Sequence, residues 1–137
     1  MALLAATAAA ARLGTEVNLT HVADKAAERI AQFELGDITT SDDADTLITD
    51  PAVDVVAELI GGIEPAKTFV LKALAAKKSV VTANKMLLAY HGAELCQAAV
   101  ENGVELRYEA AVAGTIPIIK ALREGLVANR VSLVCGI

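Results

Sequence analysis

Residues 79–85, Ser-Val-Val-Thr-Ala-Asn-Lys (SVVTANK), decide the fold class of this chain. Ser79 to Thr82 is a short, almost wholly apolar run of strand length. A long helical pattern follows from about Lys85 to Glu101, and Asn102 and Gly103 close it. A strand that is apolar on both faces and leads at once into a helix is typical of a parallel sheet with helical covers.

The same alternation of strand and helix extends in both directions along the chain. The further strands that the pattern predicts are Glu16–Ala23, Asp54–Ile60, Val104–Tyr108 and Val131–Cys135. The further helices are an alanine-rich one at Met1–Ala11, then Lys25–Phe33, Ser41–Ile48, Pro65–Ala76 and Pro117–Leu126. Ser41 is the expected N-cap of its helix. We therefore predict the α/β class, a Rossmann-like parallel sheet with helices on both faces.

Composition excludes several classes of protein. With 137 residues, 55% of them hydrophobic and 21% charged, the chain is not intrinsically disordered. The formal net charge of −5 leaves no basic field for nucleic acid. The uncharged stretches are too short to span a membrane. Cys96 and Cys135 are isolated thiols without metal-like spacing, which suits a cytoplasmic chain.

Ligands of such sheets lie beyond the carboxyl ends of the strands, so the residues that follow each strand are the candidates. Asp24 follows the first predicted strand, where its carboxylate would either accept hydrogen bonds from ribose hydroxyls or cap the next helix. Lys25 beside it could meet a 2′-phosphate, which leaves NAD and NADP both open.

Two further candidates follow the next two strands. Gly61-Gly62 would let a ligand approach the backbone, or is simply a turn. Thr82, Asn84 and Lys85 place a hydroxyl, an amide and an ammonium at the same edge. A lysine that opens a helix faces the positive end of the helix dipole, so Lys85 has an anionic or polar partner unless it is an ordinary solvated lysine.

The small-residue loop from Glu109 to Pro117 is the fourth candidate. Its backbone carbonyls could turn towards one point and hold a hard monovalent cation, although an ordinary connector has the same composition.

Three stretches together resemble the NAD(P)-binding domain of homoserine dehydrogenase. They are DVVAELIGG at 54–62, SVVTANKMLLAYHGAEL at 79–95 and GVELRYEAAVAGTIPIIKALREGL at 103–126, followed by the closing CGI. The resemblance runs from about Asp54 to Ile137. It implies NAD(P)H-dependent interconversion of L-aspartate 4-semialdehyde and L-homoserine, in the biosynthesis of threonine, methionine and isoleucine.

The resemblance also implies which residues act. The expected cofactor-binding residues are Lys85, Thr82, Gly61, Gly62 and Asp24. The expected cation, sodium or potassium, would be held by the backbone carbonyls of Glu109, Val112, Gly114 and Ile116. Lys85 would lie near the nicotinamide and could stabilise negative charge on the aldehyde oxygen. No catalytic residue is assigned within this chain.

Two parts of the family pattern are not found. The chain shows no GxGxxG-type turn, and the family's substrate domain would lie beyond Ile137. We therefore expect residues 1–137 to form a partial NAD(P)-binding domain without its first strand, with the substrate domain absent, and to be inactive alone. The full-length enzyme is expected to be a homo-oligomer. The alternative is a non-catalytic nucleotide-binding or interaction module derived from the same domain.

Overall fold

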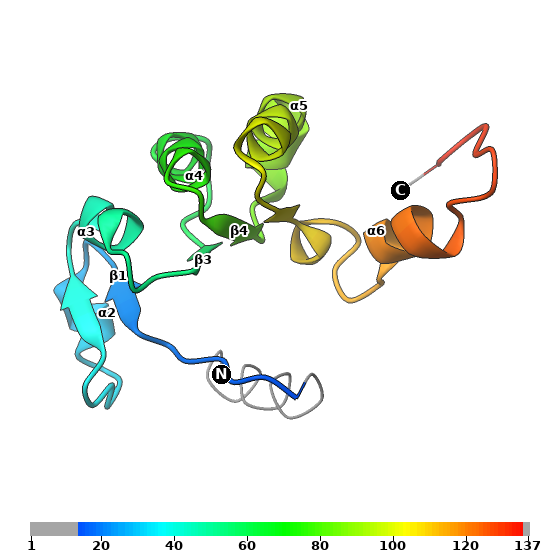
Figure 1. The fold of residues 1–137 in the computed structure, drawn as a ribbon. Helices are drawn as coiled ribbons and strands as arrows, with labels where there is room; N and C mark the ends of the chain where they lie inside the picture. Colours follow the sequence, from blue (N-terminus) through cyan, green and yellow to red (C-terminus); the bar gives the residue numbers. More distant parts are fainter. Residues whose placement is uncertain (1–13, 136–137) are drawn as a thin grey trace. The chain divides into compact units, whose positions relative to one another are not determined.

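The computed structural model describes residues 14–135, so the helix predicted at Met1–Ala11 lies outside the described residues. The chain divides into two compact units, residues 1–53 and residues 54–137. The described residues of each unit contain a parallel sheet, β1-β2 in the first and β3-β4-β5 in the second (Figure 1). The predicted parallel α/β class is therefore confirmed.

The N-terminal unit pairs two short parallel strands, and the second of its two short helices packs against them. Its elements in chain order are β1 His21–Ala23, α2 Ala27–Ile30, β2 Thr39–Ser41 and α3 Ala44–Thr49. Residues His21 and Thr39 are register partners. The His21 imidazole Nε2 lies 3.2 Å from an Asp50 carboxylate oxygen, which ties β1 to the end of α3.

Three predictions for this unit are wrong in detail. The helix predicted at Lys25–Phe33 is regular only over Ala27–Ile30. The strand predicted at Glu16–Ala23 is regular only at its last three residues, His21–Ala23. Ser41 does not cap a helix but ends β2, and the N-cap of α3 is Asp43, whose carboxylate accepts from the amide of Asp45 at 2.9 Å. Strand β2 was not predicted, because Thr-Thr-Ser has no apolar alternation and the strand exists through its pairing with β1.

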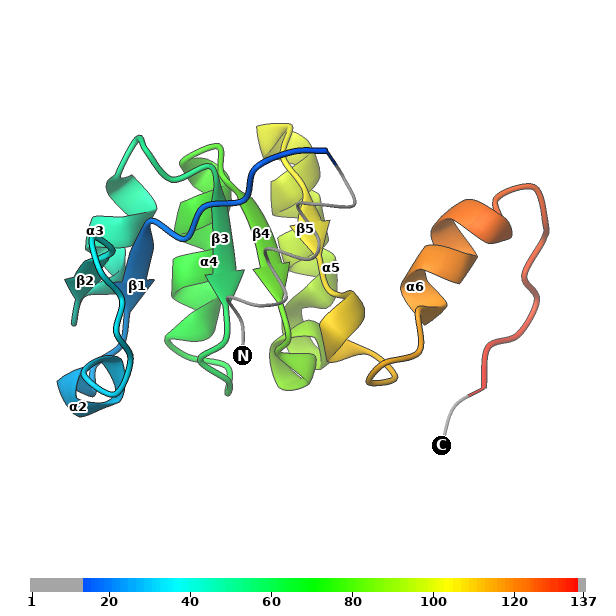
Figure 2. The same cartoon turned by 90° about the horizontal axis from the view of Figure 1, so that it is seen from below.

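The C-terminal unit is a three-stranded parallel sheet in the order β3-β4-β5. Its elements are β3 Val55–Glu58, α4 Ala66–Ala75, β4 Ser79–Thr82, α5 Lys85–Asn102 and β5 Leu106–Arg107. A 3₁₀ turn η1 Glu109–Ala111, a short helix α6 Ile118–Lys120 and a π-helical turn η2 Ala121–Gly125 follow. Helices α4 and α5 lie on the same face of the sheet (Figure 2).

Strand alternation divides the side chains of this sheet between a covered and a bare face. Between the sheet and the two helices lie the fully buried apolar residues Val70, Leu74, Val80, Leu87 and Leu95. The opposite face carries Val55, Leu59 and Val81, all exposed. The core of the unit is therefore one-sided within the described part of the chain.

The strongest sequence signals gave the most accurate bounds. Strand β4 has the predicted bounds, and α5 extends one residue beyond them, with Asn84 as N-cap and Gly103 (φ 69°) as C-cap. The helix predicted from Pro65 begins one residue later, because Pro65 is its N-cap. The strand predicted at Val131–Cys135 does not form among the described residues, where its apolar side chains are exposed and have no neighbouring strand. The described helices include none that is long and apolar enough to cross a membrane.

Candidate functional site

The carboxyl ends of β3 and β4 are joined by three buried polar side chains. Glu58 and Thr82 are register partners at the last positions of their strands. The Thr82 hydroxyl donates to Glu58 Oε2 at 2.5 Å and accepts from the backbone amide of Asn84 at 3.0 Å. Glu58 is 4% exposed, and Thr82 and Asn84 are also buried. The cluster lies at the edge where parallel sheets bind ligands.

The same cluster fixes the loop that follows β3. The other carboxylate oxygen of Glu58 accepts from the amides of Ile60 (2.7 Å) and Gly61 (3.2 Å). The Asn84 side-chain amide donates to the Gly62 carbonyl at 2.6 Å. Gly61 and Gly62 have φ of 81° and 71°, which a residue with a side chain rarely adopts, and a Cβ at either position would meet nothing within 4 Å. The space over both glycines is open to a ligand.

Asn84 also sets the start of α5. Its Oδ1 accepts from the amide of Leu87 at 3.0 Å, which is an N-cap hydrogen bond. Lys85 is the first helical residue and is exposed, and its ammonium makes no ion pair within the described part of the chain. A free positive charge at the positive end of a helix dipole is unfavourable, so an anionic ligand near Lys85 would relieve it.

Thr82 and Asp24, two of the predicted cofactor-binding residues, have protein partners. The Thr82 side chain is fully buried, and its hydroxyl both donates and accepts within the cluster. Asp24 follows β1 in the N-terminal unit, where it accepts from the amide of Ala26 at 2.9 Å and lies 3.7 Å from Arg29. Asp24 therefore closes a local turn before α2, which begins at Ala27, and is not itself the residue that precedes the helix, as the alternative interpretation expected.

The loop predicted to hold a cation begins with Glu109, whose side chain has a structural role. The two Glu109 carboxylate oxygens accept from the amides of Ile119 and Lys120, both at 2.8 Å, and so cap α6. The backbone carbonyl of Glu109 accepts from Val112, and that of Ile116 accepts from Ile118. Because a carbonyl has two lone pairs, each of these two predicted ligands keeps one acceptor position.

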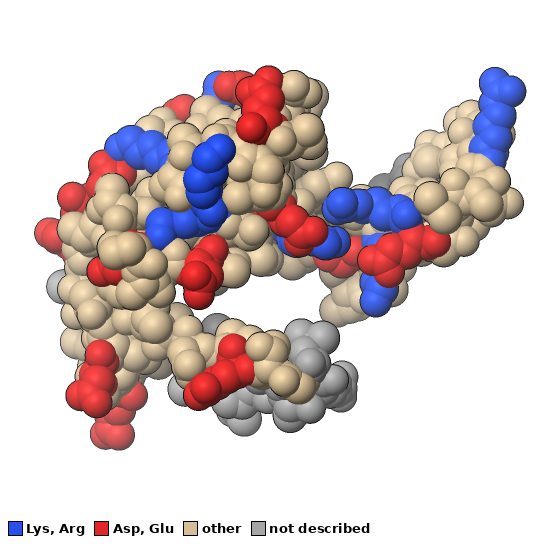
Figure 3. All heavy atoms as spheres, viewed as in Figure 1, with Lys and Arg blue, Asp and Glu red and all other residues tan. Residues whose placement is uncertain are grey.

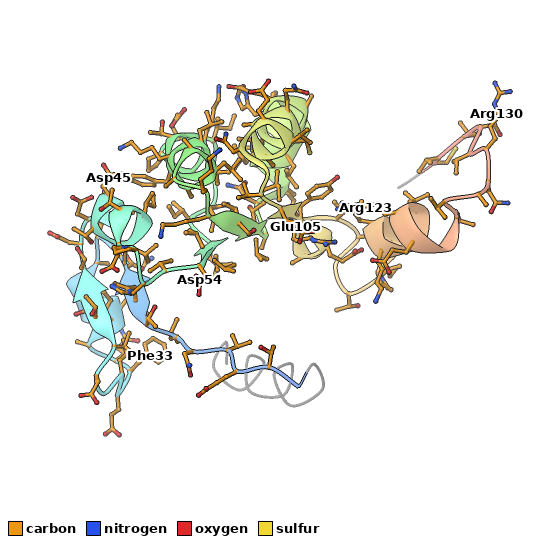
Figure 4. The ribbon with its side chains drawn as sticks, in the orientation of Figure 1. Phe33, Asp45, Asp54, Glu105, Arg123 and Arg130 are labelled. Carbon is orange, nitrogen blue, oxygen red and sulfur yellow. The ribbon has the colours of Figure 1, made fainter. Side chains whose placement is uncertain are left out.

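A shallow hollow of ≈ 320 Å³ lies between the end of β5 and α6. Its lining is Arg107, Tyr108, Glu109, Ile119, Lys120, Arg123 and Glu124. Arg107 donates two hydrogen bonds to Glu105, at 2.7 and 2.9 Å, and lowers the pKa of that carboxyl. Arg123, labelled with Glu105 in Figure 4, lowers the same pKa by a smaller amount. Burial raises the pKa of Tyr108. Basic side chains here lie beside acidic ones, as elsewhere on the visible face (Figure 3), so the hollow is not a concentrated anion site.

Two residues of the site were not among the predicted site residues. Glu58 ends an apolar strand three residues before Gly61, and a carboxyl group at that position was the available signal. Asn84 was recognised only as an amide at the edge, whereas the structure gives it two partners from different segments. Among the described residues no group of three or more His, Cys, Asp or Glu side chains is arranged to hold a metal ion.

Comparison with known proteins identifies the family to which the chain is similar. The family model for "Homoserine dehydrogenase, NAD binding domain" matches residues 1–109. The chain is 42% identical to a homoserine dehydrogenase of Bacillus subtilis over 126 residues, which are 92% of this chain and 29% of the relative. It is 58% identical to that of Pseudomonas aeruginosa over 87 residues, 64% of this chain and 20% of the relative.

A solved structure shows the same fold. The crystal structure of a homoserine dehydrogenase from Thiobacillus denitrificans superposes with a TM-score of 0.80 at 46% identity, covering 87% of this chain and 27% of that one. The chain thus spans less than a third of the length of the relatives it matches.

Proposed function

The chain belongs to the homoserine dehydrogenase NAD-binding domain family, and from this premise we propose that it forms the nucleotide-binding part of an NAD(P)-dependent homoserine dehydrogenase. The protein interconverts L-aspartate 4-semialdehyde and L-homoserine, a step towards threonine, methionine and isoleucine. When bound, the nicotinamide supplies or accepts the hydride. A non-catalytic interaction module is not favoured, since the relatives are homoserine dehydrogenases along most of this chain.

One observation carries the proposal: Asn84 holds the loop of Gly61 and Gly62 against the end of α5 that presents Lys85. The open backbone of the two glycines and the exposed ammonium suit an anionic, planar ligand that must approach closely. In this proposal Gly61, Gly62 and Lys85 contact the nucleotide. Thr82 does not contact it but holds Glu58 and Asn84 in place.

Asp24 and Lys25 are proposed for the adenosine side of the same nucleotide. To accept from ribose hydroxyls, the Asp24 carboxylate would use the lone pairs that remain beside its hydrogen bond from Ala26, with Arg29 3.7 Å away. Lys25 is exposed and would favour a 2′-phosphate, so the choice between NAD and NADP is part of the test.

A monovalent cation, sodium or potassium, is proposed at the carbonyls of Glu109, Val112, Gly114 and Ile116. The carbonyls of Glu109 and Ile116 each keep an acceptor position, which suits a weakly held ion without carboxylate ligands. Assembly into a homo-oligomer and a cytoplasmic location are likewise proposals for the whole protein.

The experiment is a fluorescence titration of the chain with NADPH and with NADH, comparing Lys85→Ala with Lys72→Ala. Both changes remove one lysine from an exposed helix position, but Lys72 lies in α4 away from the glycine loop. Loss of a charge-assisted contact should raise the Kd about tenfold or more for Lys85→Ala, and the control should change it less than about twofold. Equal effects of the two changes would refute the role of Lys85.

A separate assay addresses the reaction. Oxidation of NADPH by aspartate semialdehyde is followed by absorbance, and we expect the 137-residue chain alone to show none. Turnover by this chain would overturn the expectation that residues outside it are needed.

A further inference from the structure

We propose that Glu58, Thr82 and Asn84 form a positioning network that sets the Gly61-Gly62 loop against the N-terminus of α5. The inference rests on the proposed function, because its consequence is measured as nucleotide affinity. None of the three touches the nucleotide in this proposal; each acts through the loop or through the start of the helix.

Glu58 is the first part of the network. Its carboxylate is almost fully buried, and its three partners, the Ile60 and Gly61 amides and the Thr82 hydroxyl, are all neutral donors. A buried carboxylate is costly unless hydrogen bonds satisfy it, and an apolar residue would end a buried strand at lower cost. The carboxylate therefore serves the geometry of the loop rather than the stability of the strand.

Thr82 connects the carboxylate to the next segment. Its single hydroxyl uses its proton towards Glu58 and a lone pair towards the Asn84 amide, so β3, β4 and the start of α5 meet at one oxygen. Valine has nearly the same shape and can make neither bond, whereas serine can make both.

Asn84 closes the network. Its carbonyl oxygen caps α5 through Leu87, and its NH₂ group donates to Gly62. Serine and aspartate cap helices about as well as asparagine and threonine somewhat less well, but none of them presents an acceptor and an amide donor together. Aspartate at this position would keep the cap and place a carboxylate against the Gly62 carbonyl, which separates capping from loop positioning.

The test compares Thr82→Val, Thr82→Ser, Asn84→Asp and Glu58→Gln in the 137-residue chain. Val80→Ala is the matched control, because Val80 is fully buried in the same strand as Thr82 and takes no part in the network. Two properties are measured: the Kd for NADPH, and hydrogen exchange of the Ile60 and Gly61 amides, with the midpoint of thermal unfolding recorded for every variant.

The expected result is a Kd raised about tenfold in Asn84→Asp, which loses one buried hydrogen bond, and by at least as much in Thr82→Val, which loses two. Thr82→Ser should stay within about twofold of the wild type, since it keeps the hydroxyl. Exchange of the Ile60 and Gly61 amides should be faster in Thr82→Val and Glu58→Gln. Val80→Ala should lower the unfolding midpoint and leave both the Kd and the loop exchange unchanged.

Unchanged affinity and unchanged loop exchange in Thr82→Val and Asn84→Asp would overturn the proposal. The same holds if Val80→Ala raises the Kd as much as they do, because the effect would then be general destabilisation. If the wild type binds neither NADPH nor NADH, the proposed function fails. In that case the positioning network is tested by amide exchange alone. Faster exchange of the Ile60 and Gly61 amides in Thr82→Val and Glu58→Gln supports the network, and unchanged exchange rejects it.

Discussion

The one-sided core of the C-terminal unit predicts very different costs for the same substitution at two leucines. Leu74 in α4 is 0% exposed beneath the sheet, whereas Leu59, just after β3, is 71% exposed. Leu→Ala removes three carbon groups, worth about 2.4 kcal/mol of transfer free energy when fully buried. With the cavity that remains, Leu74→Ala should lower the free energy of unfolding by about 3 kcal/mol.

Leu59→Ala serves as the matched control. Most of its side chain already contacts water, so the same change should cost less than about 1 kcal/mol. Both values come from urea unfolding followed by far-UV circular dichroism, with the slope m compared between variants. Equal costs at the two positions would refute the reasoning, because Leu59 would then be packed in solution.

Three further predictions concern two helix caps and one ion pair in the same unit. Gly103→Ala should lower the free energy of unfolding by about 1 kcal/mol, measured by urea unfolding, because a φ of 69° is unfavourable for alanine although a Cβ would meet nothing within 4 Å. An unchanged free energy of unfolding would show that α5 does not end in a left-handed residue at this position. Glu109→Gln replaces one of two capping acceptors with a donor and should speed amide exchange of residues 118–120, whereas unchanged exchange would contradict the cap. Lys67 lies 3.0 Å from Glu94 and lowers its pKa from 4.5, so this pair stabilises the fold above that pH and the contribution is lost as pH falls through the lowered pKa. Lys67→Met should therefore weaken the acid dependence of the unfolding midpoint, and an unaltered pH profile would count against it.

Sequence patterns predicted best the elements that carry their own start and stop signals. Helix α5 has an N-cap asparagine, an apolar period and a left-handed Gly103, so local chemistry alone defines it. Strand β4 is a short apolar run between polar residues, and its bounds were equally clear. By contrast, β2 is polar and exists through pairing, which no local pattern shows.

The candidate site residues also divide into those that local sequence signals reveal and those that depend on tertiary contacts. Gly61, Gly62 and Lys85 are visible in the sequence because glycine pairs and a lysine at a helix start are unusual by themselves. The role of Glu58 depends on contacts with Thr82 across the sheet, 24 positions away, and on a loop that folds back onto it. Such a role needs the register of β3 and β4 before it can be recognised.

The parallel pairing of β3 with β4 has a consequence for how this site can change over time. Glu58, the glycine loop, Thr82, Asn84 and Lys85 all fall within one strand-helix-strand stretch and the first residue of the next helix. A single short segment of gene therefore encodes the whole arrangement. Recombination that exchanged residues 55–85 would transfer it intact, whereas a crossover inside α4 would pair a carboxylate from one parent with a hydroxyl from the other.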